Sequence, residues 1–300
     1  MEPVLLILAA GMGSRYGGMK QIDAIGPSGE TIMDYSIYDA KRAGIKKIVF
    51  VISRSAEKEF NEAIIKRYSG KTNIDYVIQD LSKTPAGISF NAVRVKPWGT
   101  GQAVLMGAEK IKEPFIVINA DDFYGFDSFR VLTDYLVSLP ADRQTEYGLA
   151  GFTLLNTLSE NGSVSRAICE EDGRHFLKTI TERFNIKRVR GVITFSENDM
   201  ETPVDGNSIT SLNMWGFTPS LFPRLKEKFE AFLINNHEST GNEFLLPACI
   251  DELIKSNLAK VKIIKSNAEW FGLTYKEDKP YVVNRINQLI AAGDYPGNLF

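Results

Sequence analysis

The chain has few of the residues that mark disulfide-stabilised or zinc-binding proteins. Among 300 residues there are only two cysteines and two histidines. Cys169 and Cys249 stand in apolar surroundings, form no Cys-x-x-Cys pair and have no paired histidines nearby. A disulfide framework and a cysteine–histidine metal site are therefore not indicated. We expect two buried thiols in a reducing compartment.

Long apolar runs and an excess of either charge are also missing. The first apolar run, residues 4–10, is far too short to cross a bilayer and has no basic leader before it. The formal net charge is −2, so no broad basic surface is available for a nucleic-acid backbone. We therefore expect a cytoplasmic protein that binds small ligands, with neither a nucleic acid nor a membrane as its partner.

Apolar runs alternate with helix-period segments in the first half of the chain. The runs lie at residues 4–10, 46–53, 73–79 and 114–120, and amphipathic segments lie at 32–43, from 57 and from 101. This alternation predicts an α/β fold with a Rossmann-like, mixed but mostly parallel sheet and helices on both faces. In such sheets, ligand sites lie at the carboxyl ends of the strands.

From residue 147 to residue 218, strand-like segments follow one another with turn signals between them. This section is expected to extend the sheet and to form a β-rich lid over its edge. Helices are expected at 219–235 and 243–256, a strand at 260–266 and a last helix after residue 280. Because no linker or repeat divides the chain, we expect one domain over residues 1–300.

The first apolar run leads into a glycine-rich loop with two cations. Residues 8–21 read LAAGMGSRYGGMKQ and include four glycines, Arg15 and Lys20. Glycine lets successive backbone N–H groups converge on an anion, so a strand followed by such a loop is typical of phosphate binding. The spacing matches neither the Walker pattern nor the dinucleotide fingerprint G-x-G-x-x-G. A turn with two solvated cations is the alternative interpretation.

This loop resembles that of the sugar-phosphate nucleotidyltransferases, also called sugar-nucleotide pyrophosphorylases. Their pattern is G-x-G-[ST]-R followed by a lysine, which here corresponds to Gly11, Gly13, Ser14, Arg15 and Lys20. Met19 stands where these proteins commonly have proline. The resemblance implies a nucleotide-binding half at residues 1–146, and a sugar-binding half with C-terminal helices at 147–300. Its implied partners are a nucleoside triphosphate and a sugar 1-phosphate.

The resemblance extends to residues that would hold the nucleotide. Gln79 ends the third apolar run, where the family places a glutamine that reads the base. Its amide suits the N3–H and a carbonyl of uracil or thymine, which favours UTP or dTTP. Residues 80–98 form an insert that departs from the compact family pattern. The implied nucleotide-binding residues are Leu8, Ala10, Gly11, Gly13, Ser14, Gln79, Gly99, Thr100 and Gly101.

Two acids, Asp121 and Asp122, follow the fourth apolar run. Asp121 resembles the strand-terminal aspartate with which the family binds Mg²⁺, and Asp122 is the rival ligand. Mg²⁺ typically takes one or two carboxylates plus phosphate oxygens. We therefore expect Mg²⁺ as cofactor on Asp121, and Asp121, Arg15 and Lys20 as the catalytic residues. A solvated turn is the alternative interpretation of the acid pair.

Four later residues resemble the family's contacts to the sugar phosphate, namely Glu182, Arg183, Asn213 and Glu243. A strand-edge ion pair, a turn amide or a charge at a helix N-terminus would explain them equally well. One position departs from the family. Gly272 stands where many relatives carry a second metal-binding aspartate. We accordingly expect Gly272→Asp to raise the metal affinity of the nucleotide-free protein.

The implied reaction needs no general base. A phosphate monoester has its second pKa near 6, so the attacking oxygen is already largely ionised at neutral pH. Catalysis would consist of holding two anions together and neutralising the leaving pyrophosphate. Two other functions stay open: a cytidylyltransferase acting on a small phosphorylated alcohol such as phosphocholine, and a non-catalytic regulator that binds a sugar nucleotide. The oligomeric state is open too, including a homo-oligomer.

Overall fold

The computed structural model of the chain describes residues 2–11, 23–85, 88–197, 200–273 and 275–300. Its strands are β1 (Val4–Leu8), β2 (Lys47–Ser53), β3 (Asn73–Gln79), β4 (Phe115–Asn119), β5 (Asp122–Phe123), β6 (Glu146–Thr153), β7 (Val164–Glu171), β8 (Leu177–Val189), β9 (Val192–Glu197), β10 (Met200–Pro203), β11 (Ile209–Phe217), β12 (Lys260–Lys265) and β13 (Phe271–Gly272). Its α-helices are α1 (Ile32–Arg42), α2 (Glu57–Phe60), α3 (Lys66–Tyr68), α4 (Thr100–Met106), α5 (Gly125–Ser138), α6 (Leu221–Asn236), α7 (Leu246–Lys255) and α8 (Lys279–Ala291).

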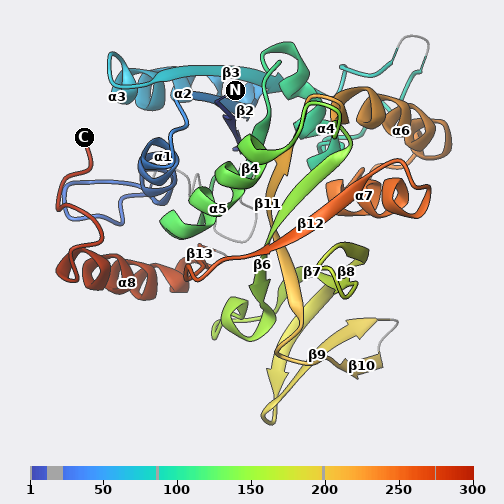
Figure 1. Cartoon of the computed structure of the whole chain (residues 1–300). Coiled ribbons are helices and arrows are strands. Elements are labelled where there is room, and N and C mark those ends of the chain that lie inside the picture. The colour runs from blue at the N-terminus through green and yellow to red at the C-terminus, as the bar shows by residue number, and fades with distance from the viewer. Residues whose placement is uncertain (1, 12–22, 86–87, 198–199, 274) are drawn as a thin grey trace.

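One eleven-stranded sheet runs through the molecule in the order β10-β9-β8-β7-β11-β4-β1-β2-β3, with β6 on β11 and β12 on β6 (Figure 1). Apolar side chains fill both of its faces. Core residues of α4, α6 and α7 pack on one face, and those of α1 and α5 pack on the other. The predicted Rossmann-like α/β fold with helices on both faces is confirmed.

The first half of the sheet is parallel. β1 pairs in parallel with β2 and β4, and β2 pairs in parallel with β3. Residues 4–7 of β1 are all buried, as expected for a strand covered by helices on both faces. Since the four strands run the same way, their carboxyl ends share one edge of the sheet. Gly11, Gln79 and Asp121 lie at or just beyond these ends.

The second half of the sheet is antiparallel except for β12, which pairs in parallel with β6, and it continues to β10, far from β3 in Figure 1. β11 joins the two halves. One of its edges pairs with β7 through residues 209–211 and with β4 through residues 215–217. Between these two stretches the register shifts, and Asn213 has a φ of 60°. The sheet therefore splits between β4 and β7, beside the carboxyl end of β4.

Helix positions agree with the sequence pattern at most places. α1 begins at Ile32, as expected, and α8 begins at Lys279, slightly before the start expected after residue 280. α7 begins later than expected, at Leu246, so Glu243 does not open this helix. The cause is Phe244, whose N–H donates to the Trp98 carbonyl (2.6 Å) and whose carbonyl accepts from Gly101 N–H (2.9 Å). These bonds hold the segment extended, and the helix starts only after them.

Both cysteines are buried and free, as the sequence predicted. Cys249 lies on α7 and Cys169 on β7, and both belong to the core beneath α4, α6 and α7. Burial raises the pKa of the Cys249 thiol to about 12, so it stays protonated at neutral pH.

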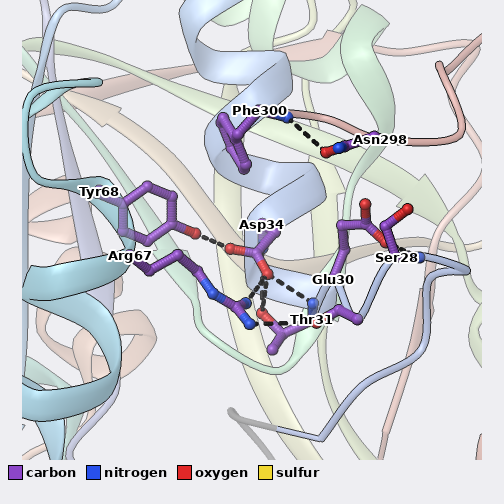
Figure 2. Close-up of polar contacts among 9 residues, drawn as sticks. Ser28, Glu30, Thr31, Asp34, Arg67, Tyr68, Asn298 and Phe300 are labelled. Atoms are coloured by element: carbon purple, nitrogen blue, oxygen red, sulfur yellow. Dashed lines mark hydrogen bonds and ion pairs between the residues drawn. The ribbon is translucent and has the colours of Figure 1, made fainter.

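A buried carboxylate connects the start of α1 to α3 (Figure 2). Asp34 is 1% exposed and completes a capping box with Thr31, accepting from its N–H at 2.6 Å. The same carboxylate accepts from the Arg67 guanidinium and the Tyr68 hydroxyl, both on α3. Burial raises the pKa of Asp34, whereas the Thr31 N–H and Arg67 act in the opposite direction.

Arg67→Ala is expected to lower the free energy of unfolding by about 2 kcal/mol, because it leaves a buried carboxylate without its charged partner. Urea denaturation measures this change. Lys66→Ala is the matched control, since Lys66 is an exposed neighbour on the same helix and should stay within about 0.5 kcal/mol of the parent. Equal losses in the two variants would show that the ion pair adds nothing to stability.

Candidate active site

A chain of hydrogen bonds holds Asp122 just beyond the carboxyl end of β4. Asp122 Oδ2 accepts from Asn119 Nδ2 at 2.9 Å and from the Tyr124 hydroxyl at 3.2 Å. Asn119 Oδ1 in turn accepts from Asn213 Nδ2 at 3.4 Å. The structure therefore brings Asp122, the rival of Asp121 as metal ligand, together with Asn213, which was predicted for the sugar side.

Asn213 owes its position to the irregularity in β11. Its left-handed backbone lies where the register of β11 shifts, between the stretches that pair with β7 and with β4. Asparagine tolerates this conformation better than most residues, and such irregularities re-aim side chains beside sites. The Asn213 amide is fixed further by Trp215 Nε1, which donates to its Oδ1 at 3.4 Å. The irregularity in β11 thus places the Asn213 amide where the sheet splits between β4 and β7.

Glu182 lies on β8 and is partly buried. It stands opposite Ala167 of β7, a residue of the core beneath α7. Burial raises the pKa of Glu182 to about 7, and the nearby Arg166 acts in the opposite direction. A carboxyl group that titrates near neutral pH is frequent at functional sites, although structural networks shift pKa values as well.

Arg166 is a charged residue of this region that the sequence analysis missed. Its Nη2 donates to the Thr157 carbonyl at 2.6 Å, its Nη1 to the Ser165 carbonyl at 2.8 Å, and its Nε to Thr157 Oγ1 at 3.3 Å. The guanidinium lies over the Trp270 ring, 4.7 Å from its centre. Burial lowers the pKa of Arg166, and Asp122 and then Glu182 oppose this shift. A cation is therefore fixed beside the acids.

Arg183 follows Glu182 in sequence but is engaged elsewhere. Its Nη1 lies 2.8 Å from Glu197 Oε2 on β9, and its guanidinium lies over the Phe195 ring at 4.5 Å. Successive strand residues point to opposite faces of a sheet. The two residues therefore do not form one pair at the site, and Arg183 has the strand-edge ion pair that was its alternative interpretation. Its role toward the sugar phosphate stays a prediction.

The amide of Gln79 has one orientation. Its Nε2 donates to the Gly99 carbonyl and to Gln102 Oε1, both at 3.0 Å. Gln102 Nε2 donates to the Asp80 carbonyl at 2.9 Å. Because a backbone carbonyl can only accept, these bonds assign the nitrogen and oxygen of both amides. Both donors of Gln79 are used within the protein, and in the described part of the chain its Oε1 is left as an acceptor.

The glycine turn at residues 99–101 has a packing function. A Cβ on Gly99 would lie 2.7 Å from the Phe244 carbonyl, and one on Gly101 would lie 2.5 Å from the Phe244 ring. The Thr100 hydroxyl accepts from the N–H of Leu246, the first residue of α7, at 3.0 Å. These three residues seat the segment before α7, so close approach of a base is not needed to explain the glycines.

Glu243 lies with the nucleotide half. Its Oε2 is 2.7 Å from Lys96 Nζ, and its Cβ lies beside Gly99. Lys96 belongs to the insert at residues 80–98, which is tied to the same segment because Arg94 donates to the Ser239 and Asn242 carbonyls, at 2.7 Å each. The structure thus places Glu243 near the Gln79 network.

The first loop follows β1 at the same sheet edge. At the end of β1 the chain still lies between β2 and β4. The Ala9 N–H donates to the Val51 carbonyl (2.8 Å), and the Ala120 N–H donates to the Leu8 carbonyl (3.1 Å). Ala10 is buried, and Gly11 is the last residue described before the loop. Gly13, Ser14, Arg15 and Lys20 lie outside the described residues.

The space expected for a second acid at position 272 is occupied. Gly272 stands opposite Asp122 in the two-stranded sheet of β5 and β13. A Cβ on Gly272 would lie 2.4 Å from Asp122 Oδ1 and 2.9 Å from the Trp270 ring. The expectation that Gly272→Asp raises metal affinity does not fit this geometry, because any side chain there must displace Asp122.

These features define an α/β protein. Its candidate site lies where the parallel half of the sheet, with its acid pair, meets the mostly antiparallel half. The chain belongs to the nucleotidyl transferase family, whose model matches residues 4–153. It is 28% identical over 192 residues to the bifunctional protein GlmU of Buchnera aphidicola subsp. Schizaphis graminum (strain Sg), which is 60% of this chain and 35% of that protein. The chain thus spans about a third of the length of this curated relative.

Two solved structures share the fold. The inositol-1-phosphate CTP transferase from T. maritima has a TM-score of 0.61 and 12% identity, with 96% of this chain and 97% of that one covered. A UDP-glucose pyrophosphorylase complexed with UDP-glucose has a TM-score of 0.60 and 18% identity, with 96% and 99% covered. In the described part of the chain, no helix is long and apolar enough to cross a bilayer.

The stability of the protein is expected to depend on pH through Glu182. Because its pKa is raised in the folded state, the folded protein holds this proton more tightly than the unfolded chain. The resulting stabilisation is fully present below the usual pKa of 4.5 and is lost as the pH rises through about 7. Glu182→Gln should therefore reduce the loss of stability between about pH 5 and pH 8, measured by chemical denaturation. Glu59→Gln, at an exposed residue of α2, should leave the profile unchanged.

Gly272→Ala is expected to destabilise the protein by about 1–3 kcal/mol, because the added Cβ forces Asp122 and Trp270 to move. Thermal unfolding measures this effect. Gly297→Ala is the matched control, since a Cβ there would meet nothing within 4 Å. Gly272→Asp should not raise the affinity of the nucleotide-free protein for Mg²⁺ in a calorimetric titration. A tighter Mg²⁺ complex in a fully folded Gly272→Asp variant would contradict this account of the site.

Proposed function

We propose that the chain transfers a nucleoside monophosphate from a nucleoside triphosphate to a sugar 1-phosphate and releases pyrophosphate. The observation that carries this proposal is the position of the Asp122, Asn119 and Asn213 chain. It lies at the split of the sheet, between the parallel half that carries Gln79 and the antiparallel half that carries Glu182. Two substrates held by the two halves would meet there. The names of the two structural neighbours, both nucleotidyl-transferring enzymes, agree with this reaction.

The proposed step is an in-line displacement at the α-phosphorus. An oxygen of the acceptor phosphate forms a bond to this phosphorus, and the bond from phosphorus to the pyrophosphate oxygen breaks. The acceptor phosphate is largely dianionic at neutral pH, so no base has to remove a proton. The positions of the two histidines agree with this, since His175 lies 3.0 Å from Glu171 and His237 follows α6. Arg15 and Lys20 would balance the charge of the triphosphate.

The donor set at the acid pair fits Mg²⁺. Asp121 and Asp122 offer carboxylate oxygens, and the described residues contain no group of three or more histidine, cysteine or acidic side chains placed to hold a metal. Mg²⁺ suits such a site because it commonly binds one or two carboxylates and takes its other ligands from phosphate and water. It would supply positive charge to the phosphates. Asn119 and Tyr124 keep the Asp122 carboxylate oriented.

Gln79 supports a pyrimidine triphosphate. With Oε1 as its remaining acceptor, it suits a base that presents a donor, such as the N3–H of uracil or thymine. We favour UTP or dTTP on this basis. The exocyclic amine of cytosine is also a donor, so the same observation supports a second candidate, a cytidylyltransferase acting on a small phosphorylated alcohol. The name of one neighbour, an inositol-1-phosphate CTP transferase, agrees with this second candidate.

Pyrophosphate release tests the reaction. UTP, dTTP, CTP, ATP and GTP are each combined with glucose 1-phosphate, inositol 1-phosphate or phosphocholine in the presence of Mg²⁺. We expect turnover with UTP or dTTP and the sugar 1-phosphate, and a loss of about a hundredfold or more in Asp121→Asn, Arg15→Ala and Lys20→Ala. Asp134→Asn, at an exposed acid of α5, is the control and should keep full turnover.

Other outcomes separate the alternatives. Turnover with CTP and phosphocholine or inositol 1-phosphate would favour the second candidate. If no pair gives pyrophosphate while a calorimetric titration shows that a sugar nucleotide binds, the chain is a non-catalytic binding protein. Equal turnover with purine triphosphates would contradict the role of Gln79.

A further inference from the structure

A cavity of about 900 Å³ lies beside the acids on the opposite face of the sheet from Glu182. Along β7, Ala167 and Cys169 belong to the core beneath α7, and Glu182 stands opposite Ala167. Arg166 therefore points to the other face, where it stacks on Trp270 and lines the cavity. The lining of the cavity includes neither Asp121 nor Glu182, and none of the residues predicted to bind the nucleotide.

Arg166, Asn207 and Ile209 line this cavity, and four segments form the rest of its walls. They are the end of β6, the 3₁₀ helix Leu154–Thr157 with the turn after it, the link from β12 to β13, and the start of α8. The floor includes Trp270, which is 8% exposed, and Phe271, which is 2% exposed. Trp270 Nε1 is buried, and the described residues provide no acceptor for it. Buried N–H groups normally have a partner, so this donor indicates a bound molecule or water.

The rim of the cavity is polar. It includes five exposed side chains for which the described part of the structure gives no hydrogen-bond or ion-pair partner, namely Asn156, Glu160, Asn207, Lys265 and Asn267. Three of them are amides, which donate and accept, and the other two are one anion and one cation. The rim therefore offers many hydrogen bonds and no net charge.

We infer that this cavity binds a neutral polyhydroxylated molecule of monosaccharide or disaccharide size. Hydroxyl groups donate and accept as the rim amides do. The volume lies within the usual range of small-molecule sites. A strongly charged ligand is disfavoured, since the charges of Glu160 and Asp278 balance those of Lys265 and Arg166. Glu269 is paired with Arg285.

A molecule bound in the cavity would affect the acid pair through two residues. Arg166 forms part of the wall and acts on Asp122 and Glu182 by its charge. Gly272 also lines the cavity, and a Cβ added to it would lie 2.4 Å from Asp122 Oδ1. A molecule on the floor would hold Trp270 and Arg166 in place and so affect the position of Asp122. The inference does not depend on the proposed reaction, because binding can be measured without a nucleotide.

Tryptophan fluorescence tests this site, with glucose and sucrose as the probes. We expect a saturable change at millimolar sugar for at least one of them, and no change in Trp270→Phe, because Trp98 and Trp215 are fully buried elsewhere in the core. Saturation-transfer NMR reports binding without a fluorophore. By this measurement, Asn156→Ala/Asn207→Ala should weaken the sugar complex at least tenfold. Asn235→Ala, an exposed amide on α6, is the matched control.

Circular dichroism and thermal unfolding confirm that each variant is folded. Binding that survives in Glu182→Gln and in the presence of a non-hydrolysable UTP analogue, but weakens in the double variant, supports the second site. Two results would overturn it. One is the absence of saturable binding of either sugar to the folded protein. The other is binding that is lost in Glu182→Gln and kept in the double variant, which would place the sugar in the acceptor site.

Discussion

The geometry of the site depends on the hydrogen bonds made by the Tyr124 hydroxyl. This group is fully buried and lies 2.7 Å from the Leu212 carbonyl of β11 and 3.2 Å from Asp122 Oδ2, and the N–H of Asn119 donates to it at 3.1 Å. One oxygen thus connects β4, the acid pair and the strand that joins the two halves. Burial, and then the charge of Asp122, keep the pKa of Tyr124 well above its usual value, so the hydroxyl keeps its proton.

The split between β4 and β7 explains why functional residues gather there. If one antiparallel strand paired with the whole length of β11, the backbone groups of β11 would all be used in regular strand pairing. The shift between Ser211 and Trp215 instead leaves a gap at the end of the parallel strands, where α/β sheets commonly bind ligands. Arg166 approaches this gap from one face of the sheet, and Glu182 lies on the other.

Much of the fold could be predicted from local pattern. The alternation of apolar runs and amphipathic segments was sufficient for the parallel half, because strand and helix periods differ. Asp121, Gln79 and Asn213 were proposed from the family resemblance, and the first two also stand at or just after the ends of predicted strands. Their roles stay predictions. Arg166 could not be found, since its importance depends on carbonyls of Thr157 and Ser165 and on the ring of Trp270, which is 104 positions away in sequence.

Two other differences have the same origin in tertiary contacts. The start of α7 is delayed because Phe244 is paired with Trp98 and Gly101, and no local helix signal reports such a pairing. Gly272 looked like a missing acid in the sequence. In the folded chain, the carboxylate of Asp122 lies against it across the β5–β13 pair, so a glycine is the residue that fits.

The locked amide of Gln79 has a consequence for how base preference could change. Its orientation is set by the carbonyl of Gly99 and by Gln102, which is itself held by the carbonyl of Asp80. Main-chain carbonyls are present whatever the side chains are. The course of the backbone therefore determines which end of the Gln79 amide donates and which accepts. A homologous chain could not reverse it by a single exchange at position 79. Reversal would require the loop around Gly99 to take another course, which Phe244 and the insert at residues 80–98 oppose together.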